Sequence, residues 1–308
     1  MNVIHSQNQM LKAYVGMAMS TLIIGLSFVF VKIALRSAGP FDVLAHRFNA
    51  AVIALLLLYV TGIVKKPKLN RKQFLQLLSI SVFYPLLFFG LQTIGLQYTT
   101  ASEAGIMSAI TPVMTLLLAS LLLKERHTIG QIMGVVLSVA GIGYIFMKSG
   151  TIIHGNSIRG NFIILLSVFS IVFYYIFGRK INKHYRTIDI TFVMIVLAAI
   201  VFNVIAIGNH LAHGTMHEFI APLSHSSFIL AILYLGVLSS MVTSVFNNYA
   251  LVYIPASQVA VINNLTPLIS IMGGIMILDE QLHLFHFIGA AMVILGVLAT
   301  TFFQHRNS

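Results

Sequence analysis

The strongest constraint on this chain is a series of ten apolar stretches, each long enough to cross a lipid bilayer as one helix. Such a helix needs ~20 apolar residues to span a hydrocarbon core of roughly 30 Å. The stretches lie near residues 13–34, 41–64, 74–97, 101–123, 128–147, 160–178, 188–208, 227–251, 256–278 and 284–303. Only 8% of the 308 residues are charged, against roughly a quarter in soluble domains. We therefore predict an all-α integral membrane protein with ten transmembrane helices.

Several function classes lack the residues that they need. The chain has no cysteine, which excludes disulfides, iron–sulfur clusters, haem thiolates and thiolate zinc sites. The sequence has no HExxH or GxSxG motif, no phosphate-binding loop and no pair of carboxylates within one apolar stretch. Such features would indicate a metalloprotease, a serine hydrolase or a nucleotide-driven pump. We therefore expect neither an enzyme nor a bound cofactor.

Positive charges are concentrated on one side of the predicted membrane. Ten crossings place both termini on the same side, and that side carries Lys12, Lys65, Lys66, Lys68, Arg71, Lys72, Lys124, Arg126, Arg179, Lys180, Lys183, Arg186 and Arg306. The opposite side has only Lys32, Arg36, Lys148 and Arg159. The positive-inside rule predicts a multi-pass protein of a bacterial plasma membrane with both termini cytoplasmic. Topology and anionic lipid then account for the net charge of +11 without a nucleic-acid partner.

The two halves of the chain contain an internal repeat. Residues 96–141 align without gaps on residues 251–296, and the matched positions include a Thr-Pro pair, a glutamate and two glycines. The matches are Tyr98 with Tyr253, Thr111-Pro112 with Thr266-Pro267, Glu125 with Glu280, Gly134 with Gly289 and Gly141 with Gly296. Because each half then holds five helices, the second copy enters the membrane from the opposite side. We predict two inverted repeats, residues 1–148 and 149–308.

Inverted repeats of this kind are the architecture of secondary transporters. In such proteins the substrate sits near the bilayer midplane between the halves, which rock around it in alternating access. The sequence therefore predicts a secondary transporter for a small molecule. A channel would instead need a selectivity-filter motif or a ring of charges.

The chain also resembles the EamA family of the drug/metabolite transporter superfamily. The resemblance rests on Lys32 near the end of the first stretch, on Pro40 and Arg47 in the second, and on the Ala-Ser, Thr-Pro and Glu order in the fourth and ninth. It covers residues 15–303. It implies a cavity walled by both halves and the export of amino acids, other metabolites or toxic compounds. One departure is that the second half has an apolar residue, near Met194, where the first has Arg47.

Arg47 is the first candidate for substrate binding. It lies six residues into its helix, and an arginine inside the hydrocarbon costs at least ~2.5 kcal/mol on insertion scales. Its planar guanidinium is suited to a carboxylate or another anion. The alternative is a structural arginine that snorkels to the surface or pairs with Asp42 or Glu103.

Amide and aromatic residues extend this candidate site. Two adjacent amides lie in the ninth stretch and two more in the eighth, and polar groups at such depth hydrogen-bond either to other helices or to a ligand. The predicted substrate-binding set is Arg47, Gln92, Tyr98, Asn247, Asn248, Asn263 and Asn264, with Tyr174 and Tyr175 as further aromatic walls.

Three ionisable residues are candidates for proton coupling, namely Glu103, His46 and Asp42. Glu103 lies near the outer end of a predicted cavity helix, where burial would favour its protonated form. The alternative is a structural carboxylate in the first turn of its helix, stabilised by the helix dipole. Glu125 and Glu280 lie in short loops, and we expect each to cap the helix that follows it.

Two prolines and two glycine-rich stretches bear on movement and assembly. Pro112 and Pro267 lie in mid-span, where each is expected to kink its helix and act as a hinge. The glycines of the fifth and tenth stretches permit close helix packing and leave a homodimer open.

The outer loop offers an alternative function. His210, His213 and His217 would share one face of a continuous helix, with a spacing compatible with a metal ion. On that hypothesis the protein is a metal-responsive membrane sensor or a transporter of metals or other cations.

Overall fold

The protein is helical throughout the part of the chain that the structure describes. The computed structural model describes residues 2–64, 69–123, 129–152, 156–182, 184–254, 259 and 262–305, and these contain no strand. The helices of the first half are α1 (Asn2–Leu35), α2 (Pro40–Val60), α3 (Arg71–Ser81), η1 (Val82–Leu87), α4 (Phe88–Gly95), α5 (Ala101–Ser108), α6 (Thr111–Leu123) and α7 (Ile129–Ile152). Those of the second half are α8 (Asn156–Asn182), α9 (Thr187–His213), α10 (Met216–Ile220), η2 (Ala221–Ser224), α11 (Ser226–Leu233), η3 (Tyr234–Val242), α12 (Thr243–Tyr253), η4 (Asn263–Leu265), α14 (Thr266–Leu278) and α15 (Leu284–His305).

The apolar helices coincide with the ten stretches predicted from the sequence. Among the described residues, seven helical segments of at least 18 residues are apolar enough to cross a membrane. Three shorter apolar helices, 132–145, 266–278 and 284–299, occupy the other predicted stretches. The prediction of an all-α integral membrane fold is confirmed.

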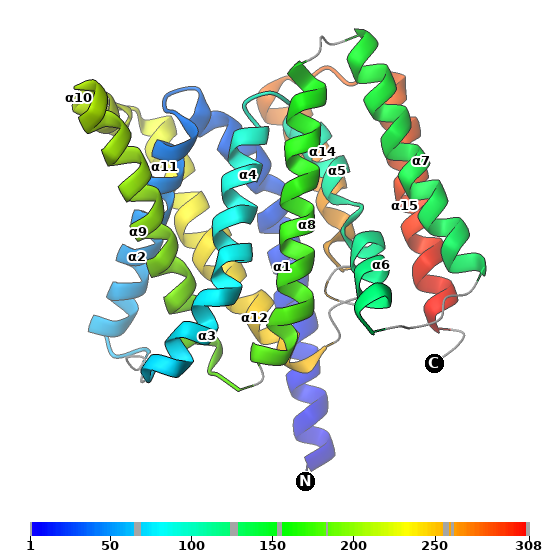
Figure 1. Ribbon diagram of the computed structural model, residues 1–308, viewed down its shortest axis with the longest axis horizontal. Helices are drawn as coiled ribbons and strands as arrows, with labels where there is room; N and C mark the ends of the chain where they lie inside the picture. The colour runs from blue at the N-terminus through cyan, green and yellow to red at the C-terminus, as the bar shows by residue number, and fades with distance from the viewer. Residues whose placement is uncertain are drawn as a thin grey trace.

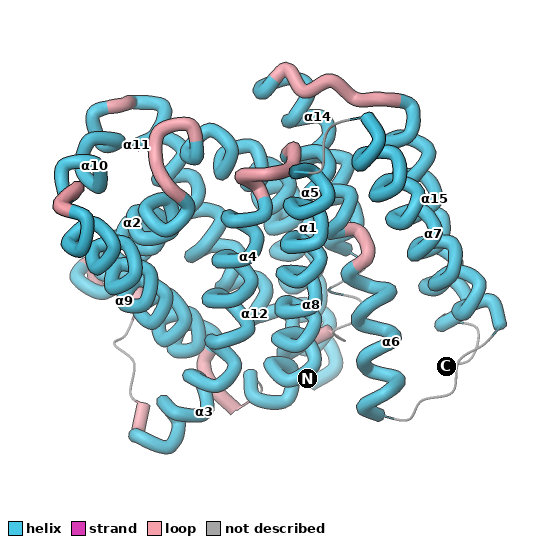
Figure 2. Tube along the Cα trace, turned by 45° about the horizontal axis from the view of Figure 1, so that its top comes forward, coloured by secondary structure: helices cyan, strands magenta, loops and turns pink. Residues whose placement is uncertain are grey.

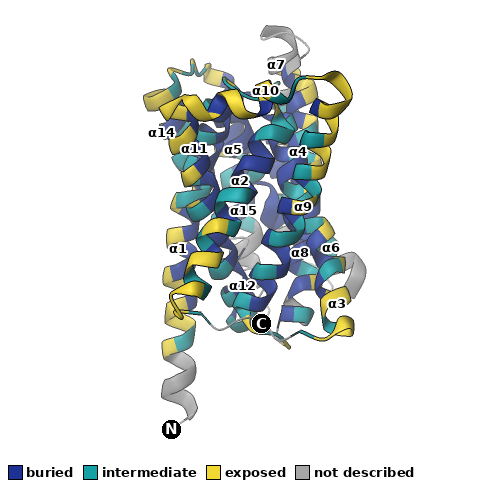
Figure 3. Ribbon diagram, turned by 90° about the vertical axis from the view of Figure 1, so that its left-hand side faces the viewer, coloured by how far each residue is buried: buried dark blue, intermediate teal, exposed yellow. Residues whose placement is uncertain are grey.

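The chain begins and ends at the same end of the bundle. Figures 1 and 3 place the start of α1 and the end of α15 at the lower end, and the short helix α10 at the opposite end. Exposed large apolar side chains cover the outside of the bundle, including Val60, Met276 and Leu284. In a bilayer these side chains face lipid, so their exposure is no defect of packing.

Helices α7 and α15 pack against each other as a pair at one edge of the bundle (Figures 1 and 2). Glycines make the close approach possible, because a Cβ atom added to Gly141 would lie 2.9 Å from the carbonyl oxygen of Gly289. The glycines of the fifth and tenth stretches thus allow these two helices to approach each other closely within one chain.

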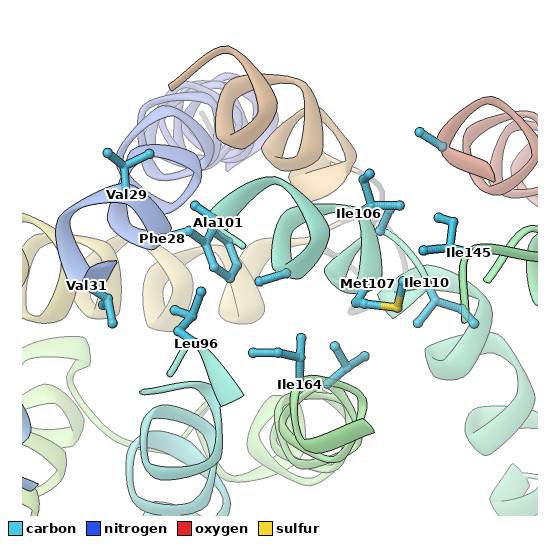
Figure 4. Packing of buried hydrophobic residues seen from close by; sticks show 14 of the residues in the cluster. Phe28, Val29, Val31, Leu96, Ala101, Ile106, Met107, Ile110, Ile145 and Ile164 are labelled. Carbon is cyan, nitrogen blue, oxygen red and sulfur yellow. The ribbon is translucent and has the colours of Figure 1, made fainter. Parts of the chain in front are cut away.

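Helix α5 lies in the interior. Every residue from Ala101 to Met107 is buried. Figure 4 shows three of its residues, Ala101, Ile106 and Met107, in a cluster of buried apolar side chains. The cluster includes Phe28 of α1, Ile164 of α8 and Leu96, which follows α4. A helix that touches both halves in this way can transmit movement between them.

Four spans are irregular near mid-membrane. Segments η1 and η3 are widened π-turns, and the offset of the repeat alignment, extended toward the N-terminus, pairs residues 82–87 with residues 237–242 inside η3. Turns of this kind occur often at functional sites. The other two irregularities are the break at residues 109–110 between α5 and α6 and the 3-10 turn η4 before α14.

The prolines lie at these last two breaks. The sequence led us to expect kinks in continuous helices, whereas Pro112 and Pro267 each lie in the first turn of a new helix. The reason is that proline has no backbone N–H. In the first turn of a helix that N–H would have no helical partner, whereas in the middle of a helix its loss removes a backbone hydrogen bond. Whether these breaks act as hinges stays a proposal.

Candidate substrate cavity

A cavity lies at the centre of the bundle between the irregular segments. Its walls come from α1, η1, α4, α5, α6, α8, η3, α12, η4 and α14, so both halves contribute. The polar lining residues are Ser27, Tyr84, Gln92, Ser108, Thr111, Tyr175, Ser239, Thr243, Asn247, Asn263 and Thr266, and the apolar ones include Phe28, Phe88 and Phe89. The volume open to the centres of water molecules in this cavity is about 50 Å³, which is room for a few water molecules. A metabolite would need these side chains to move apart.

Arg47 is fully buried beside this cavity. Its Nε donates to Ser240 Oγ at 2.7 Å and its Nη2 to Ser239 Oγ at 3.0 Å. The ring of Phe89, a lining residue, lies 3.9 Å from the guanidinium carbon. The third nitrogen, Nη1, has no hydrogen-bond partner within the described part of the chain. One guanidinium nitrogen therefore remains available to donate a hydrogen bond, and the ring of Phe89 covers the guanidinium.

Gly236 explains why η3 comes so close to Arg47. A Cβ atom at position 236 would lie 2.5 Å from the Arg47 carbonyl oxygen and 2.7 Å from the Ala50 Cβ atom. Only glycine lets the π-turn pack directly on α2. This contact places both serines on the guanidinium.

The carboxylates suggested as structural partners of Arg47 are engaged elsewhere. Asp42 accepts from His210 Nε2 at 3.0 Å. His46, next to Arg47 in the chain, points away from it and donates from Nε2 to the carbonyl oxygen of Phe219 at 2.8 Å. Among the described residues, the polar partners of the guanidinium are the two serines alone.

Three buried oxygen atoms of lining residues lack partners. They are Gln92 Oε1, Asn247 Oδ1 and Thr266 Oγ1, each without a hydrogen bond within the described ranges. Buried polar atoms of this kind are costly unless water or a ligand pairs with them. Asn263 also lines the cavity, but its Nδ2 donates to Tyr175 Oη at 3.0 Å and its Oδ1 accepts from Thr21 at 3.1 Å.

Other predicted binding residues lie outside the cavity lining. Asn248 belongs to a buried network in which Oδ1 accepts from Tyr174 and Nδ2 donates to Thr191 at 3.0 Å. Tyr98 lies beyond the cavity with the Arg159 guanidinium 4.5 Å from its ring centre. The side chain of Asn264 lies outside the described residues.

Glu103 lies in a second polar cluster outside the cavity. The carboxyl group is fully buried, with His286 Nε2 3.1 Å from Oε1 and Ser157 Oγ 2.6 Å from Oε2. Oε2 also lies 2.5 Å from Thr99 Oγ1 and 3.5 Å from Asn161 Nδ2. Glu103 is thus surrounded by groups from α8 and α15 as well as by its own half.

Glu280 caps a helix of the opposite half. The sequence led us to expect a cap on the following helix, but its carboxylate accepts from the backbone N–H groups of Ala101 and Ser102 at 2.7 and 3.0 Å. These are first-turn N–H groups of α5, which have no partner inside their own helix. Its partner in the repeat alignment, Glu125, lies outside the described residues.

The histidines of the outer loop do not converge. Gly214, with φ of 67°, ends α9 after His213, so His217 belongs to the separate helix α10. His213 Nδ1 donates to the Asn209 carbonyl oxygen, and His217 lies 3.9 Å from Glu218 in an exposed pair. Within the described ranges no group of three potential metal ligands is present.

The profile of the EamA-like transporter family matches residues 11–147 and again residues 158–302. The chain belongs to the EamA family. It is a multi-pass membrane transporter.

Relatives of this EamA protein extend over almost its whole length. It is 40% identical to the uncharacterized transporter YcxC of Bacillus subtilis over 294 residues, which cover 96% of this chain and 94% of the relative. It is 29% identical to an uncharacterized transporter of Archaeoglobus fulgidus, with coverage of 96% and 99%. A protein of known crystal structure superposes with a TM-score of 0.66 at 13% identity, covering 96% and 98%, a likeness of fold alone.

Sequence reasoning missed several residues that define the surroundings of Arg47. Phe89, Ser239 and Ser240 touch its guanidinium, and none of them was a candidate. The adjacent serines in an apolar span were a usable signal, because hydroxyl pairs at that depth need partners. Phe89 gave no signal, since phenylalanine is common in lipid-facing positions.

Proposed function

We propose that this EamA protein is a secondary carrier that moves a small metabolite bearing a carboxylate or a similar anionic group, such as an amino acid or a related organic acid. The proposed direction is export across the plasma membrane, with both termini in the cytoplasm. The observation that supports this most is the buried Arg47, whose Nη1 has no partner among the described residues.

A buried arginine with an unpaired N–H donor lowers the stability of a membrane protein. Insertion of arginine at mid-membrane costs roughly 2.5–3.5 kcal/mol on insertion scales. An ion pair would offset that penalty, but the described contacts of the guanidinium are two serine hydroxyl groups and the rings of Phe89 and Phe48. A substrate anion would supply the missing charge and a bidentate contact. Substrate binding would therefore explain why an arginine is buried at this position.

Phe89 stands between the arginine and the cavity. Its ring lines the cavity and packs on the guanidinium at 3.9 Å, which provides a cation–π contact while the site is empty. In the proposed mechanism, the incoming anion displaces this ring and reaches Nη1. Gln92, Asn247 and Thr266 then hydrogen-bond the rest of the substrate through their unpartnered oxygens.

Alternating access would use the mid-membrane breaks. Ser108 and Thr111 flank one break and Asn263 and Thr266 flank the other, and all four line the cavity. Rocking of the halves at these points opens the cavity first to one side and then to the other. The carrier needs no cofactor in this scheme.

The test measures ligand-induced stabilisation of the purified protein. A ligand that binds the native state raises its apparent melting temperature. The detergent-purified protein is screened against amino acids, organic acids, nucleosides, polyamines and zinc, with thermal unfolding followed by circular dichroism. We expect at least one carboxylate compound to stabilise the wild type and not Arg47→Gln, whereas Arg186→Gln, a change at an exposed arginine, keeps the response.

Two outcomes would contradict the proposal. Equal stabilisation of wild type and Arg47→Gln by the same carboxylates would remove Arg47 from the site. Stabilisation by zinc alone, lost in His213→Ala, would favour the metal-linked alternative. As a check on folding, Arg47→Gln should keep the wild-type elution profile and helical content.

A further inference from the structure

Glu103 lies in a buried cluster that the substrate site does not use. Its carboxyl group has no solvent exposure, and Glu103 itself does not line the central cavity. We propose that Glu103 carries a proton in this conformation and that release of this proton loosens the contact between the two halves. The effect of proton release on the two halves rests on the proposed carrier function, whereas the protonation of Glu103 does not.

The first argument is a count of hydrogen atoms. Thr99 Oγ1 lies 2.5 Å from Glu103 Oε2 and 2.6 Å from Asn161 Oδ1. Both contacts are within hydrogen-bond distance, but a hydroxyl group has one hydrogen to donate. If Glu103 is ionised, one of these contacts joins two oxygens with no hydrogen between them. A proton on Oε2 donates to Thr99, which then donates to Asn161, and both contacts are satisfied.

Turning over the Asn161 amide does not rescue the ionised form. The turn would place the amide nitrogen toward Thr99 and the amide oxygen at the position now 3.5 Å from Glu103 Oε2. A carbonyl oxygen would then face a carboxylate oxygen in a site without water contact. Repulsion of this kind is strong at low dielectric. The orientation that pairs Asn161 with both neighbours is the one that needs the extra proton.

The second argument concerns the histidine partner. His286 Nδ1 accepts from the backbone N–H of His283 at 3.0 Å, so this nitrogen carries no proton. Its proton is on Nε2, which donates to Glu103 Oε1 at 3.1 Å. His286 is therefore neutral and supplies no positive charge to balance an ionised Glu103.

The third argument is the charge balance of the surroundings. Lys32 of α1 interacts electrostatically with Glu280 of the α14–α15 loop, and more weakly with Arg36 and with Glu103 itself. Lys32 Nζ donates to the carbonyl oxygens of Leu96 and Thr99, both at 3.0 Å. Arg36 and Arg159 are exposed at the rim, and His283 contacts the cluster through its backbone. With Glu103 neutral, Lys32 and Glu280 balance each other; with Glu103 ionised, two carboxylates share this one partly buried lysine.

The position of the site gives the proton mechanical consequences. Glu103 joins α5 of the first half to Ser157 and Asn161 of α8 and to His286 of α15. Loss of its proton would break the Thr99 chain and push Asn161 away. In the repeat alignment Glu103 pairs with Gln258, which cannot ionise. A proton acting at one end only would make opening of the two ends respond differently to pH.

Infrared spectroscopy tests the protonation directly. A protonated carboxyl group has its own C=O stretching band, and the chain has only seven acidic residues. At neutral pH, wild-type protein in detergent should show this band, and Glu103→Gln should lose it. Glu218→Gln, which changes an exposed carboxylate, should leave the band unchanged. Spectra of wild type and Glu103→Gln without a difference in this band would overturn the proposal.

A thiol reporter tests the mechanical consequence without any substrate. Because the chain has no cysteine, Ser108→Cys introduces a single reactive thiol at the cavity wall. Any thiol is labelled faster as pH rises, because the thiolate is the nucleophile. The labelling rate in proteoliposomes should therefore rise more steeply with pH in Ser108→Cys than in the double variant with Glu103→Gln. The double variant should show only the rise due to thiol ionisation, because the glutamine amide imitates the protonated acid toward Thr99 and His286.

The outcomes separate the two proposals. A carboxyl band that belongs to Glu103, together with the same pH dependence of labelling in Ser108→Cys with and without Glu103→Gln, would refute the mechanical role and keep the protonation. Neither experiment involves a substrate or Arg47. Failure of the anion screen therefore leaves these results interpretable, and the reverse is also true.

Discussion

Arg47 and Glu103 are both fully buried, yet their surroundings differ in opposite ways. Arg47 has five N–H donors in principle, and its described contacts are two serine hydroxyl groups and two aromatic rings. Glu103 has hydrogen-bonding groups of Thr99, Ser157, Asn161 and His286 around one carboxyl group. The first site lacks a partner that a ligand can supply, and the second is complete once a proton is counted. The difference teaches that burial alone does not assign a role; the number of unmatched donors and acceptors does.

The largest expected effect is a difference in sign between the two sites. Arg47→Met removes an unpaired buried charge, so the free energy of unfolding of the ligand-free protein should stay unchanged or rise by up to about 3 kcal/mol. Glu103→Leu leaves the buried partners of the carboxyl group without an acceptor or donor, and each such group costs about 1–3 kcal/mol. We expect Glu103→Leu to lower stability by at least about 2 kcal/mol.

Thermal unfolding of the two variants by circular dichroism measures this difference. Glu103→Gln is the control that keeps the hydrogen bonds, and its melting temperature should lie near that of the wild type. A large loss of stability in Arg47→Met would mean that the arginine is structural and would end the comparison.

A smaller effect is expected from forcing η3 away from α2. Gly236→Ala places a methyl group against the Arg47 backbone, and forcing extra volume into a packed contact costs typically about 1–3 kcal/mol. The variant should also weaken the response to stabilising carboxylates, because Ser239 and Ser240 move off the guanidinium. Gly143→Ala is matched to it, since a Cβ atom there meets nothing within 4 Å. If both alanine variants behave alike, η3 does not position Arg47.

The smallest effect is expected from the serines themselves. Ser240→Ala removes one neutral hydroxyl acceptor from Arg47, which is worth on the order of 1 kcal/mol. Because the freed Nε becomes available, affinity for the stabilising carboxylate should remain or increase. Ligand titration of the melting temperature gives this affinity. A complete loss of binding in Ser240→Ala would show that the hydroxyl group, and not the arginine, contacts the ligand.

Much of the fold could be predicted because membrane crossing constrains sequence so directly. Every predicted stretch contains an apolar helix, and Arg47 was identified as an anomaly from its depth alone. The partner of each buried polar group could not be predicted in the same way. Ser240 lies 193 residues from Arg47, and His286 lies 183 residues from Glu103. No local pattern links positions so far apart.

The helix geometry expected around the histidines and the prolines differs from the structure for a related reason, whereas the hinge role of the prolines stays a prediction. His210, His213 and His217 share a face only if the helix continues, and the left-handed Gly214 ends it. Pro112 kinks a helix only if the helix is already formed before it, whereas a turn at residues 109–110 separates α5 from α6. In both cases one or two backbone angles decided the outcome.

The amino-acid sequence by itself determined the membrane class, the helical segments, the duplication and the presence of costly polar groups in mid-span, because hydrocarbon solvent tolerates so few alternatives. Only the tertiary structure decided which of those groups remain unmatched. Gly236 lets η3 pack against α2 at Arg47, where one guanidinium nitrogen stays without a partner among the described residues. Helices α8 and α15 supply hydrogen-bond partners to Glu103. The physical reason is that hydrogen-bond satisfaction depends on distances of a few tenths of an ångström between helices, and helix packing alone sets those distances.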